Sequence, residues 1–309
     1  MRGVSRVGAG NGVSKTRAFS ALAAAGILWG TGFLFGKWAL EELSVGQMVL
    51  YRFLFASLGF APAVWTGLRN PATRIRKEDL KLILLAALVG VPIQFLIQFA
   101  GLARTTVSHA SLMVGVLPVM LAAGSALFTH EHVTVRRWIA LIASTAGAGL
   151  IALGASTGEA GGKATLLGDL LVVASLVAAI AWILMGQALM KANRYSPAHA
   201  SAYVMVAGTP MLALWVFATE GPLPVRLTAL TWMSVAAMGL LATTASTLLW
   251  NWGLAQVPAS QAGVFINLEP VVGAILGVLI LSEKLGPYGI LGGVLVIGSA
   301  IYVAMDSKP

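Results

Sequence analysis

Two ionisable side chains, Arg52 and Glu269, lie inside long apolar stretches of the sequence. At a helical rise of about 1.5 Å per residue, Glu269 is about 14 Å past Ser260 and Arg52 is about 9 Å into its own stretch. An acid at that depth could bind an ammonium group, carry a proton, or act as a structural carboxylate. The arginine could hold a carboxylate with its fork of donors, or it could anchor to backbone carbonyls or reach outward to the interface.

Polar side chains follow one face of two further apolar stretches. Gln94 and Gln98 are one helical turn apart, and Thr243, Thr247 and Asn251 repeat that spacing. Residues four apart lie on the same face of a helix. These two stripes predict either the lining of a cavity or hydrogen bonds between helices.

Large aromatic residues accompany the polar stripes. Trp29, Tyr203, Trp250 and Trp252 could stack on an aromatic or apolar group of a small molecule. Trp and Tyr also gather at the interfaces between membrane and water, which is an equally good explanation for each of them. Trp29, Tyr203 and Trp250 are kept as candidate cavity residues.

The residue patterns that enzymes and metal sites need are missing. The chain has no Cys, which excludes thiolate catalysis and iron–sulfur clusters, and it has no His-Glu-x-x-His motif. His109 and His199 have no metal partner at a suitable spacing, and the cluster at residues 130–132 (HEH) is at most a weak metal site. We therefore expect no enzyme activity, no cofactor and no metal.

The composition places these residues in a membrane protein. Of the 309 residues, 58% are hydrophobic and 10% are charged, whereas soluble proteins have about 25% charged residues. A membrane-spanning helix needs about 20 mostly apolar residues. The sequence predicts ten such spans: 18–40, 46–66, 80–103, 107–128, 135–155, 167–190, 197–218, 228–255, 260–281 and 286–305.

The distribution of basic residues predicts the orientation. If the N-terminus lies inside the cell, ten crossings put most of the 20 Lys and Arg residues on the inner side and return the C-terminus there. Cytoplasmic loops of membrane proteins carry such an excess. It explains the net charge of +9 without a nucleic-acid partner. We expect an uncleaved first span after a disordered cytoplasmic tail at residues 1–17.

The chain contains an internal repeat. A shift of 152 residues places Pro118 on Pro270 and Glu131 on Glu283. The shift covers five spans, so the second copy must lie upside down relative to the first. Inverted repeats are typical of secondary transporters, whose substrate site lies between the halves, although a channel could also arise by duplication.

The paired prolines predict helix breaks. Pro118 and Pro270 each fall near the middle of a predicted span, where proline removes an intrahelical hydrogen bond. Irregular backbone at membrane depth is tolerated only against protein or a watery cavity. The two breaks therefore predict gates beside a central cavity, or else kinks healed by packing. Small residues four apart, such as Gly26 and Gly30, predict close helix packing, with sliding surfaces or a dimer contact as alternatives.

Several short strings resemble the EamA-type, ten-span members of the drug/metabolite transporter superfamily. They are Trp29-Gly30, Arg52-Phe53, residues 268–274 (LEPVVGA) and residues 282–285 (SEKL). Within that family the chain looks most similar to aromatic amino-acid exporters of the YddG type. The resemblance implies export of small metabolites across a bacterial inner membrane through a cavity between two five-helix halves.

The embedded charges narrow the expected substrate. A phosphorylated solute would need several buried cations, and a lipophilic dication would need several buried acids. One acid, one base and many aromatics suit a neutral or aromatic amino acid. We therefore expect a secondary exporter of amino acids working by alternating access, as a monomer or homodimer. The alternatives are an exporter of drugs or other metabolites and a channel-like pore.

The predicted fold is an all-α integral membrane protein with two inverted repeats around a central cavity. Its predicted parts are a tail (1–17), the first five-helix repeat (18–155), an external linker (156–166), the second five-helix repeat (167–305) and a cytoplasmic tail (306–309).

Overall fold

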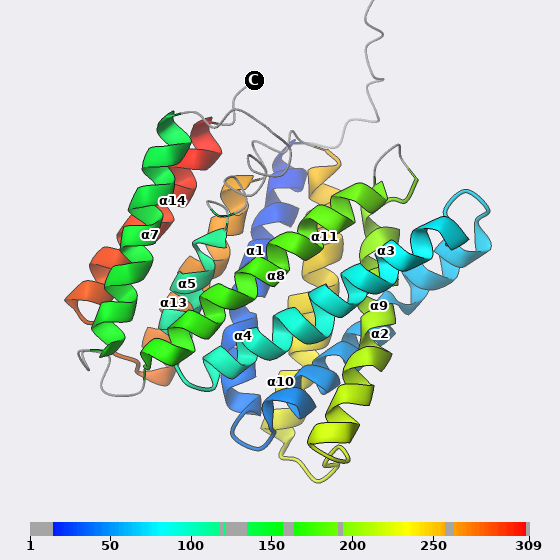
Figure 1. Cartoon of the computed structure of the whole chain (residues 1–309), viewed down its shortest axis with the longest axis horizontal. Helices are drawn as coiled ribbons and strands as arrows, with labels where there is room; N and C mark the ends of the chain where they lie inside the picture. Colours follow the sequence, from blue (N-terminus) through cyan, green and yellow to red (C-terminus); the bar gives the residue numbers. More distant parts are fainter. Residues whose placement is uncertain are drawn as a thin grey trace, which may run out of the picture.

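A computed structural model describes residues 15–117, 120, 135–156, 164–190, 194–256 and 263–306 (Figure 1). Within these ranges the chain forms helices and connecting segments, with no β-strand. Pro118, the cluster at residues 130–132, and the greater part of the predicted tails and linker lie outside the described residues.

Helices follow one another along both halves of the chain. The first half contains α1 (Lys15–Ala39), α2 (Val45–Arg69), α3 (Lys77–Leu88), the π-helical η1 (Val89–Ile93), α4 (Gln94–Leu102), α5 (Val107–Val114) and α7 (Val135–Ser156). The second half contains α8 (Leu166–Met190), α9 (Pro197–Thr219), α10 (Ala229–Gly239), the π-helical η3 (Leu240–Ala245), α11 (Ser246–Leu254), the 3-10 helix η4 (Gly263–Asn267), α13 (Leu268–Leu281) and α14 (Pro287–Asp306).

Six helices of the described part are long and apolar enough to cross a membrane. They are Lys15–Ala39, Val45–Arg69, Lys77–Leu102, Leu166–Met190, Pro197–Thr219 and Ala229–Leu254. Shorter apolar helices coincide with three more predicted spans, at Trp138–Ile151, Phe265–Leu281 and Pro287–Ser299. The all-helical membrane fold is thus confirmed, and the number ten stays a prediction.

Hydroxyl side chains set where several helices begin. Ser44 and Gln47 form a capping box at the start of α2, and Ser196 caps α9 at the position that the repeat makes equivalent to Ser44. Thr106 caps α5 and Thr228 caps α10. Such oxygens accept hydrogen bonds from backbone amides that the first helical turn leaves unpaired. The predicted break between the third and fourth spans is therefore confirmed.

The two halves pack as related copies. Helix α1 packs against α11, and α8 packs against α4 in the same relation, while α2 packs on its repeat equivalent α9. At the α2–α9 contact the hydroxyls of Ser57 and Thr209, which are 152 residues apart, lie at 2.9 Å. Tyr51 donates to the Pro224 carbonyl at 2.8 Å, and its equivalent Tyr203 donates to the Thr73 carbonyl at 3.0 Å.

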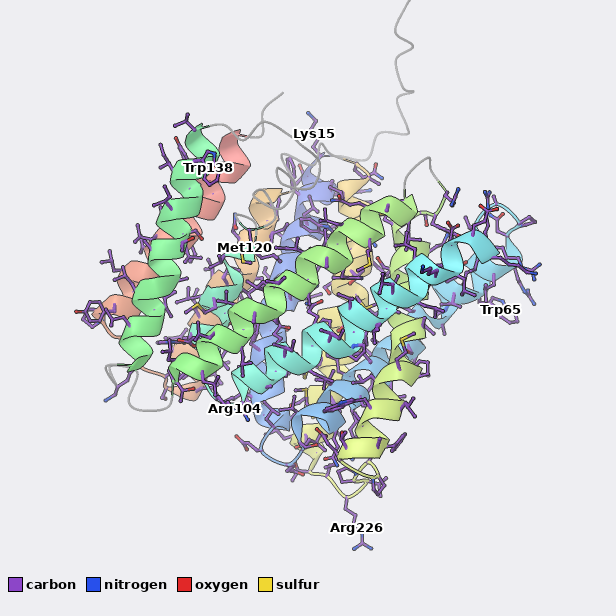
Figure 2. The ribbon with its side chains drawn as sticks, in the orientation of Figure 1. Lys15, Trp65, Arg104, Met120, Trp138 and Arg226 are labelled. Carbon is purple, nitrogen blue, oxygen red and sulfur yellow. The ribbon has the colours of Figure 1, made fainter. Side chains whose placement is uncertain are left out.

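The first helices of the two halves run in opposite directions. Near the end of α1, the Lys37 ammonium donates to the Leu102 carbonyl at 3.0 Å and to the Thr105 carbonyl at 2.7 Å. Near the start of α8, Asp169 accepts from the Thr105 hydroxyl at 2.5 Å. The end of α1 and the start of α8 therefore meet at one end of the molecule. Figure 2 shows Arg104 at that end and Lys15 at the other, which we call the Arg104 end and the Lys15 end.

Both copies interrupt a helix at the same point of the repeat. Helix α5 ends at Val114 with a turn at Gly115. The equivalent of Gly115 is Asn267, where η4 gives way to α13. Pro270 is the third residue of α13, so it lies in the first helical turn, where a backbone amide has no intrahelical acceptor. Proline at this position therefore does not interrupt a continuous helix. The helix type changes shortly before Pro270, and the role of Pro270 as a gate stays a prediction.

Glycines of α1 lie against this interrupted helix. A Cβ added at Gly26 would be 2.4 Å from the Phe265 carbonyl oxygen, and one at Gly30 would be 2.8 Å from the Glu269 carbonyl oxygen. Only a residue without a side chain allows helix backbones to approach this closely. The spacing of Gly26 and Gly30 thus serves packing against η4 and α13.

Three glutamates join the two halves at the Arg104 end. Glu42 accepts from the Thr228 amide at 3.0 Å, Glu220 accepts from the Gln47 amide at 3.0 Å, and Glu283 accepts from the Val107 amide at 2.7 Å. Each carboxylate lies at the start of a helix from the other half, where negative charge is favoured. These bonds hold the Arg104 end together. We call Glu42, Glu220 and Glu283 the bridging glutamates.

The Glu42 bridge predicts a pH-dependent stability. Hydrogen bonds from the Thr228 hydroxyl, the Thr228 amide and the Thr231 hydroxyl hold the pKa of Glu42 below its ordinary value of 4.5. A lowered folded-state pKa means that stabilisation is present above the ordinary value and is lost as the pH falls through the lowered one. We expect Glu42→Ala to lower the melting temperature at pH 7, and the loss to disappear at strongly acid pH.

The neighbouring Glu41 supplies the control. It is exposed, and its side chain forms no hydrogen bond within the described part of the chain. Glu41→Ala should therefore leave the melting temperature in detergent unchanged at both pH values. Equal effects of the two substitutions would contradict the bridging role.

Candidate functional site between the halves

Arg52 is buried in α2, with only 6% of its surface exposed. Its Nε atom donates to the Thr243 hydroxyl at 2.8 Å, and Thr243 in turn donates to the Met238 carbonyl at 2.8 Å. The π-helical turn of η3 places Thr243 there. Within the described residues this is the one hydrogen bond of the Arg52 side chain. The two terminal nitrogens of the guanidinium thus remain available as donors.

Aromatic rings support the guanidinium of Arg52. Its central carbon lies 4.5 Å from the Phe95 ring centre, 5.5 Å from Phe99 and 5.8 Å from Phe53. Such cation–π contacts stabilise a desolvated cation without using its hydrogen-bond donors. Phe95 and Phe99 were not predicted as site residues, because one sequence carries no sign of which apolar residues of α4 face α2.

Glu269 provides the opposite charge. It is the second residue of α13, and its carboxylate is close enough to Arg52 for the two charges to attract each other. Its side chain is partly exposed, and no described residue donates a hydrogen bond to it. The structure therefore brings together the two embedded charges that the sequence singled out.

Asn267 adds a second group without partners beside Glu269. It is 4% exposed, and neither its amide oxygen nor its amide nitrogen finds a hydrogen bond within the described residues. A buried unpaired amide is costly. Asn267 was not among the candidate residues of the sequence analysis; its polar side chain next to Glu269 in an apolar span was the available signal.

Trp29 and Trp250 form an aromatic pair between α1 and α11. Their ring centres are 5.3 Å apart, and both side chains are partly exposed. Trp29 precedes Gly30, which lies against the backbone of Glu269. The pair is thus connected to the charged residues through α1. Thr247 lies one turn before Asn251 on α11 and is also partly exposed.

The remaining polar candidates were predicted either to line a cavity or to form hydrogen bonds between helices. Gln94 and Gln98 are both 7% exposed, and the Gln94 oxygen has no partner in the described part of the chain. Asn251 instead donates to the Ser201 hydroxyl on α9 at 3.4 Å, which is a bond between helices. Tyr203 lies apart from the other candidate residues. Its hydroxyl donates to the Thr73 carbonyl at the Lys15 end.

The central cavity stays a prediction. The structure shows a hollow of about 580 Å³ at the Arg104 end, lined by residues such as Lys37 and Arg104, and a groove of about 170 Å³ that includes Tyr203. Arg52, Glu269 and the tryptophan pair line neither of them.

His109 and His199 have structural partners. His109 Nδ1 lies 3.0 Å from an oxygen of buried Asp169, and His199 bonds to Ser196. Among the described residues there is no group of three or more acidic or histidine side chains that could hold a metal ion.

Comparison with known proteins identifies the family. The EamA-like transporter family matches residues 16–153 and again residues 166–305. A solved structure that covers 95% of this chain superimposes with a TM-score of 0.66 at 16% identity, which supports the fold alone. The superposition also covers 98% of the length of that solved structure.

Full-length relatives are named as transporters. An uncharacterized transporter of Archaeoglobus fulgidus is 28% identical over 92% of this chain and 95% of its own length. The uncharacterized transporter YetK of Bacillus subtilis is 24% identical over 94% of this chain and 88% of its own. A probable terminal-alkyne amino-acid exporter of Streptantibioticus cattleyicolor is 26% identical, covering 93% of each chain.

Since the transporter family matches each half separately, this all-helical membrane chain is a transporter by class. The chain belongs to the EamA-like transporter family of the drug/metabolite transporter superfamily.

Proposed function

We propose that this protein is a secondary transporter that exports neutral or aromatic amino acids across a bacterial inner membrane. The observation that carries the proposal is the pair of buried Arg52 and partly exposed Glu269, each with unused hydrogen-bonding capacity. A single cation beside a single anion suits a zwitterion, since both charges of the solute find an opposite charge and the complex stays neutral. Burial makes each of these contacts stronger than it would be in water.

Each part of an amino acid has a matching group at this site. The terminal nitrogens of Arg52 would bind the carboxylate as a fork. Glu269 would bind the ammonium group, with the Asn267 amide as a further partner. Trp29 and Trp250 would pack against an apolar or aromatic side chain. The amino-acid exporter among the relatives supports this substrate class.

Movement of the solute would follow from the inverted halves. Rocking of the two five-helix units would expose the site to each side in turn, with the interrupted helices at Gly115 and Asn267, beside Pro118 and Pro270, flexing as gates. The bridging glutamates would part when the Arg104 end opens. Ten spans with both termini in the cytoplasm place Lys15 inside and Arg226 outside, in agreement with their opposite positions in Figure 2.

Counterflow in proteoliposomes tests the substrate class. Vesicles loaded with unlabelled phenylalanine or leucine should take up the labelled amino acid faster than empty vesicles, with saturation. Exchange of a drug or a sugar nucleotide but of no amino acid would replace this proposal with the drug or metabolite exporter. Large unitary currents in electrical recordings, without saturable flux, would replace it with a channel-like pore.

Substitution of Glu269 by glutamine tests the ammonium contact. The amide keeps the shape and one acceptor but loses the charge, and hydrogen bonds to charged groups are stronger than neutral ones by about 1 kcal/mol or more. We expect the apparent affinity for amino acids in counterflow to fall about 5- to 10-fold. Glu78→Gln, at an exposed position of α3, should leave it unchanged.

The same variant separates ammonium binding from proton coupling. If export by the unaltered protein responds to a pH gradient through Glu269, Glu269→Gln must abolish that response. A response that persists in the variant rules out the proton role. An unaltered affinity rules out the ammonium contact.

A further inference from the structure

A groove opens on the side of the molecule near the Lys15 end, apart from the candidate site. Its volume is about 170 Å³. Its walls come from three helices, namely Val64 of α2, Leu80, Ile83 and Leu84 of α3, and Val206 and Ala207 of α9. All six side chains are apolar, so the groove suits a hydrocarbon chain.

Basic residues are neighbours in sequence of the residues that line this groove. Ile75 is one of the lining residues, and Arg74 and Arg76 precede and follow it in the chain. Lys77 and Lys81 lie one helical turn before the wall residues Leu80 and Leu84, on the same face of α3. These four side chains are exposed, and none has a carboxylate partner within the described part of the chain.

The acidic residues of this segment do not neutralise the positive charge of these four side chains. Asp79 is 6% exposed and is occupied by Arg194 and by the Tyr195 hydroxyl, which donates to it at 2.8 Å. Glu78 is exposed and is the other acid among residues 69–81. The segment therefore keeps a clear excess of positive charge at the groove.

The segment that carries the cations is held in a fixed conformation. Tyr203 donates to the Thr73 carbonyl at 3.0 Å, and the Thr73 hydroxyl donates to the Gly67 carbonyl at 3.0 Å. The Arg76 amide donates to the Tyr195 hydroxyl at 3.2 Å. A segment ordered in advance loses little entropy when it binds a ligand. Tyr203 also lines the groove, so one residue fixes the basic segment and the apolar wall together.

Trp65 indicates the depth of the groove in the membrane. It is 59% exposed, and Figure 2 shows it at the outer edge of the molecule. The Arg69 guanidinium stacks 4.0 Å from its ring centre. Exposed Trp residues prefer the level of the lipid head groups. Val64, the adjacent residue, belongs to the groove wall, so the groove begins at the level where head groups meet acyl chains.

We propose that this groove binds an anionic phospholipid, with its phosphate at Arg74, Arg76 and Lys77 and one acyl chain between α2, α3 and α9. The apolar walls distinguish this ligand from free phosphate, which would gain nothing from them. The unpaired cations distinguish it from an uncharged lipid. Because α3 belongs to the first half and α9 to the second, one bound lipid contacts both halves. The proposal does not depend on the substrate of the transporter.

Native mass spectrometry of the purified full-length protein tests the proposal. The probes are dioleoyl phosphatidylglycerol, which is anionic, and dioleoyl phosphatidylcholine, which has the same chains but no net charge. We expect one phosphatidylglycerol to be retained about tenfold more than phosphatidylcholine, which corresponds to about 1.4 kcal/mol. Arg74→Gln combined with Arg76→Gln should remove this preference. Arg226→Gln, at an exposed site of the Arg104 end, should preserve it.

A second pair of variants tests the apolar walls. Ala207→Leu fills the groove and should lower retention of both lipids. Leu80→Gln changes a side chain that is 45% exposed and should do the same without disturbing the core. Glycerol phosphate should fail to displace the bound lipid. Equal retention of the two lipids, full displacement by glycerol phosphate, or unchanged retention in folded Ala207→Leu and Leu80→Gln proteins would each overturn the proposal.

Discussion

Replacing Arg52 with methionine is expected to abolish amino-acid counterflow while the protein still folds. Methionine fills a similar volume among Phe53, Phe95 and Phe99. Removing one partner of a charge pair is strongly destabilising when the remaining charge is buried, but the side chain of Glu269 is partly exposed and can be hydrated. The substrate carboxylate would lose two charge-assisted hydrogen bonds, each with a net contribution of about 1.5–3 kcal/mol. Transport at low substrate concentration should therefore fall at least about 100-fold.

Two further variants separate charge from geometry. Arg52→Lys keeps the charge but loses the planar fork, so transport should fall less than in Arg52→Met but remain clearly reduced. Arg226→Met changes an exposed arginine that is remote from the site and should transport normally. Normal transport by a well-folded Arg52→Met protein would show that Arg52 anchors helices and does not bind the substrate.

Gly26→Ala is expected to destabilise the protein strongly although it adds one methyl group. The new Cβ would lie 2.4 Å from the Phe265 carbonyl oxygen, a backbone atom that can move only if η4 moves. Overpacking of this kind costs about 1–3 kcal/mol. We expect a lower melting temperature in detergent and weaker transport, because the shifted backbone leads directly into Asn267 and Glu269.

The same substitution at Gly186 is the matched control. A Cβ there meets no atom within 4 Å. Alanine has a higher helix propensity than glycine by about 1 kcal/mol, so Gly186→Ala should be neutral or stabilising. Equal stability of the two variants would contradict the close contact between α1 and η4.

The sequence was sufficient to predict most of the helices and their relation by a repeat. Long apolar stretches mark spanning helices, and Pro270 marks an irregular backbone, because both follow from the chemistry of the chain itself. The exact place of the break could not be predicted. Asn267 is the residue before the first residue of α13, and its side chain forms no capping hydrogen bond. Gly26 and Gly30 of α1 pack on this backbone, and a single sequence does not reveal that contact.

The candidate site was predictable only as separate residues. Arg52 and Glu269 stood out because charge is rare within a span. Their proximity depends on how α2, α4 and α13 pack, and a single sequence gives no information about contacts between distant segments. Tyr203 was grouped with the cavity for its aromatic ring, yet its hydroxyl is used at the Lys15 end. Its repeat partner Tyr51 makes the equivalent bond to Pro224, so the pair serves to anchor loops.

The π-helical segments η1 and η3 determine which way the rest of their helices face. A π turn contains one residue more than an α turn, and one residue corresponds to about 100° of rotation around a helix axis. Deleting a single residue within Leu240–Ala245 would therefore swing Trp250 and Asn251 around the axis by more than a quarter turn, while the helix stayed intact and apolar. In this fold, the orientation of an entire half-helix depends on the length of one turn.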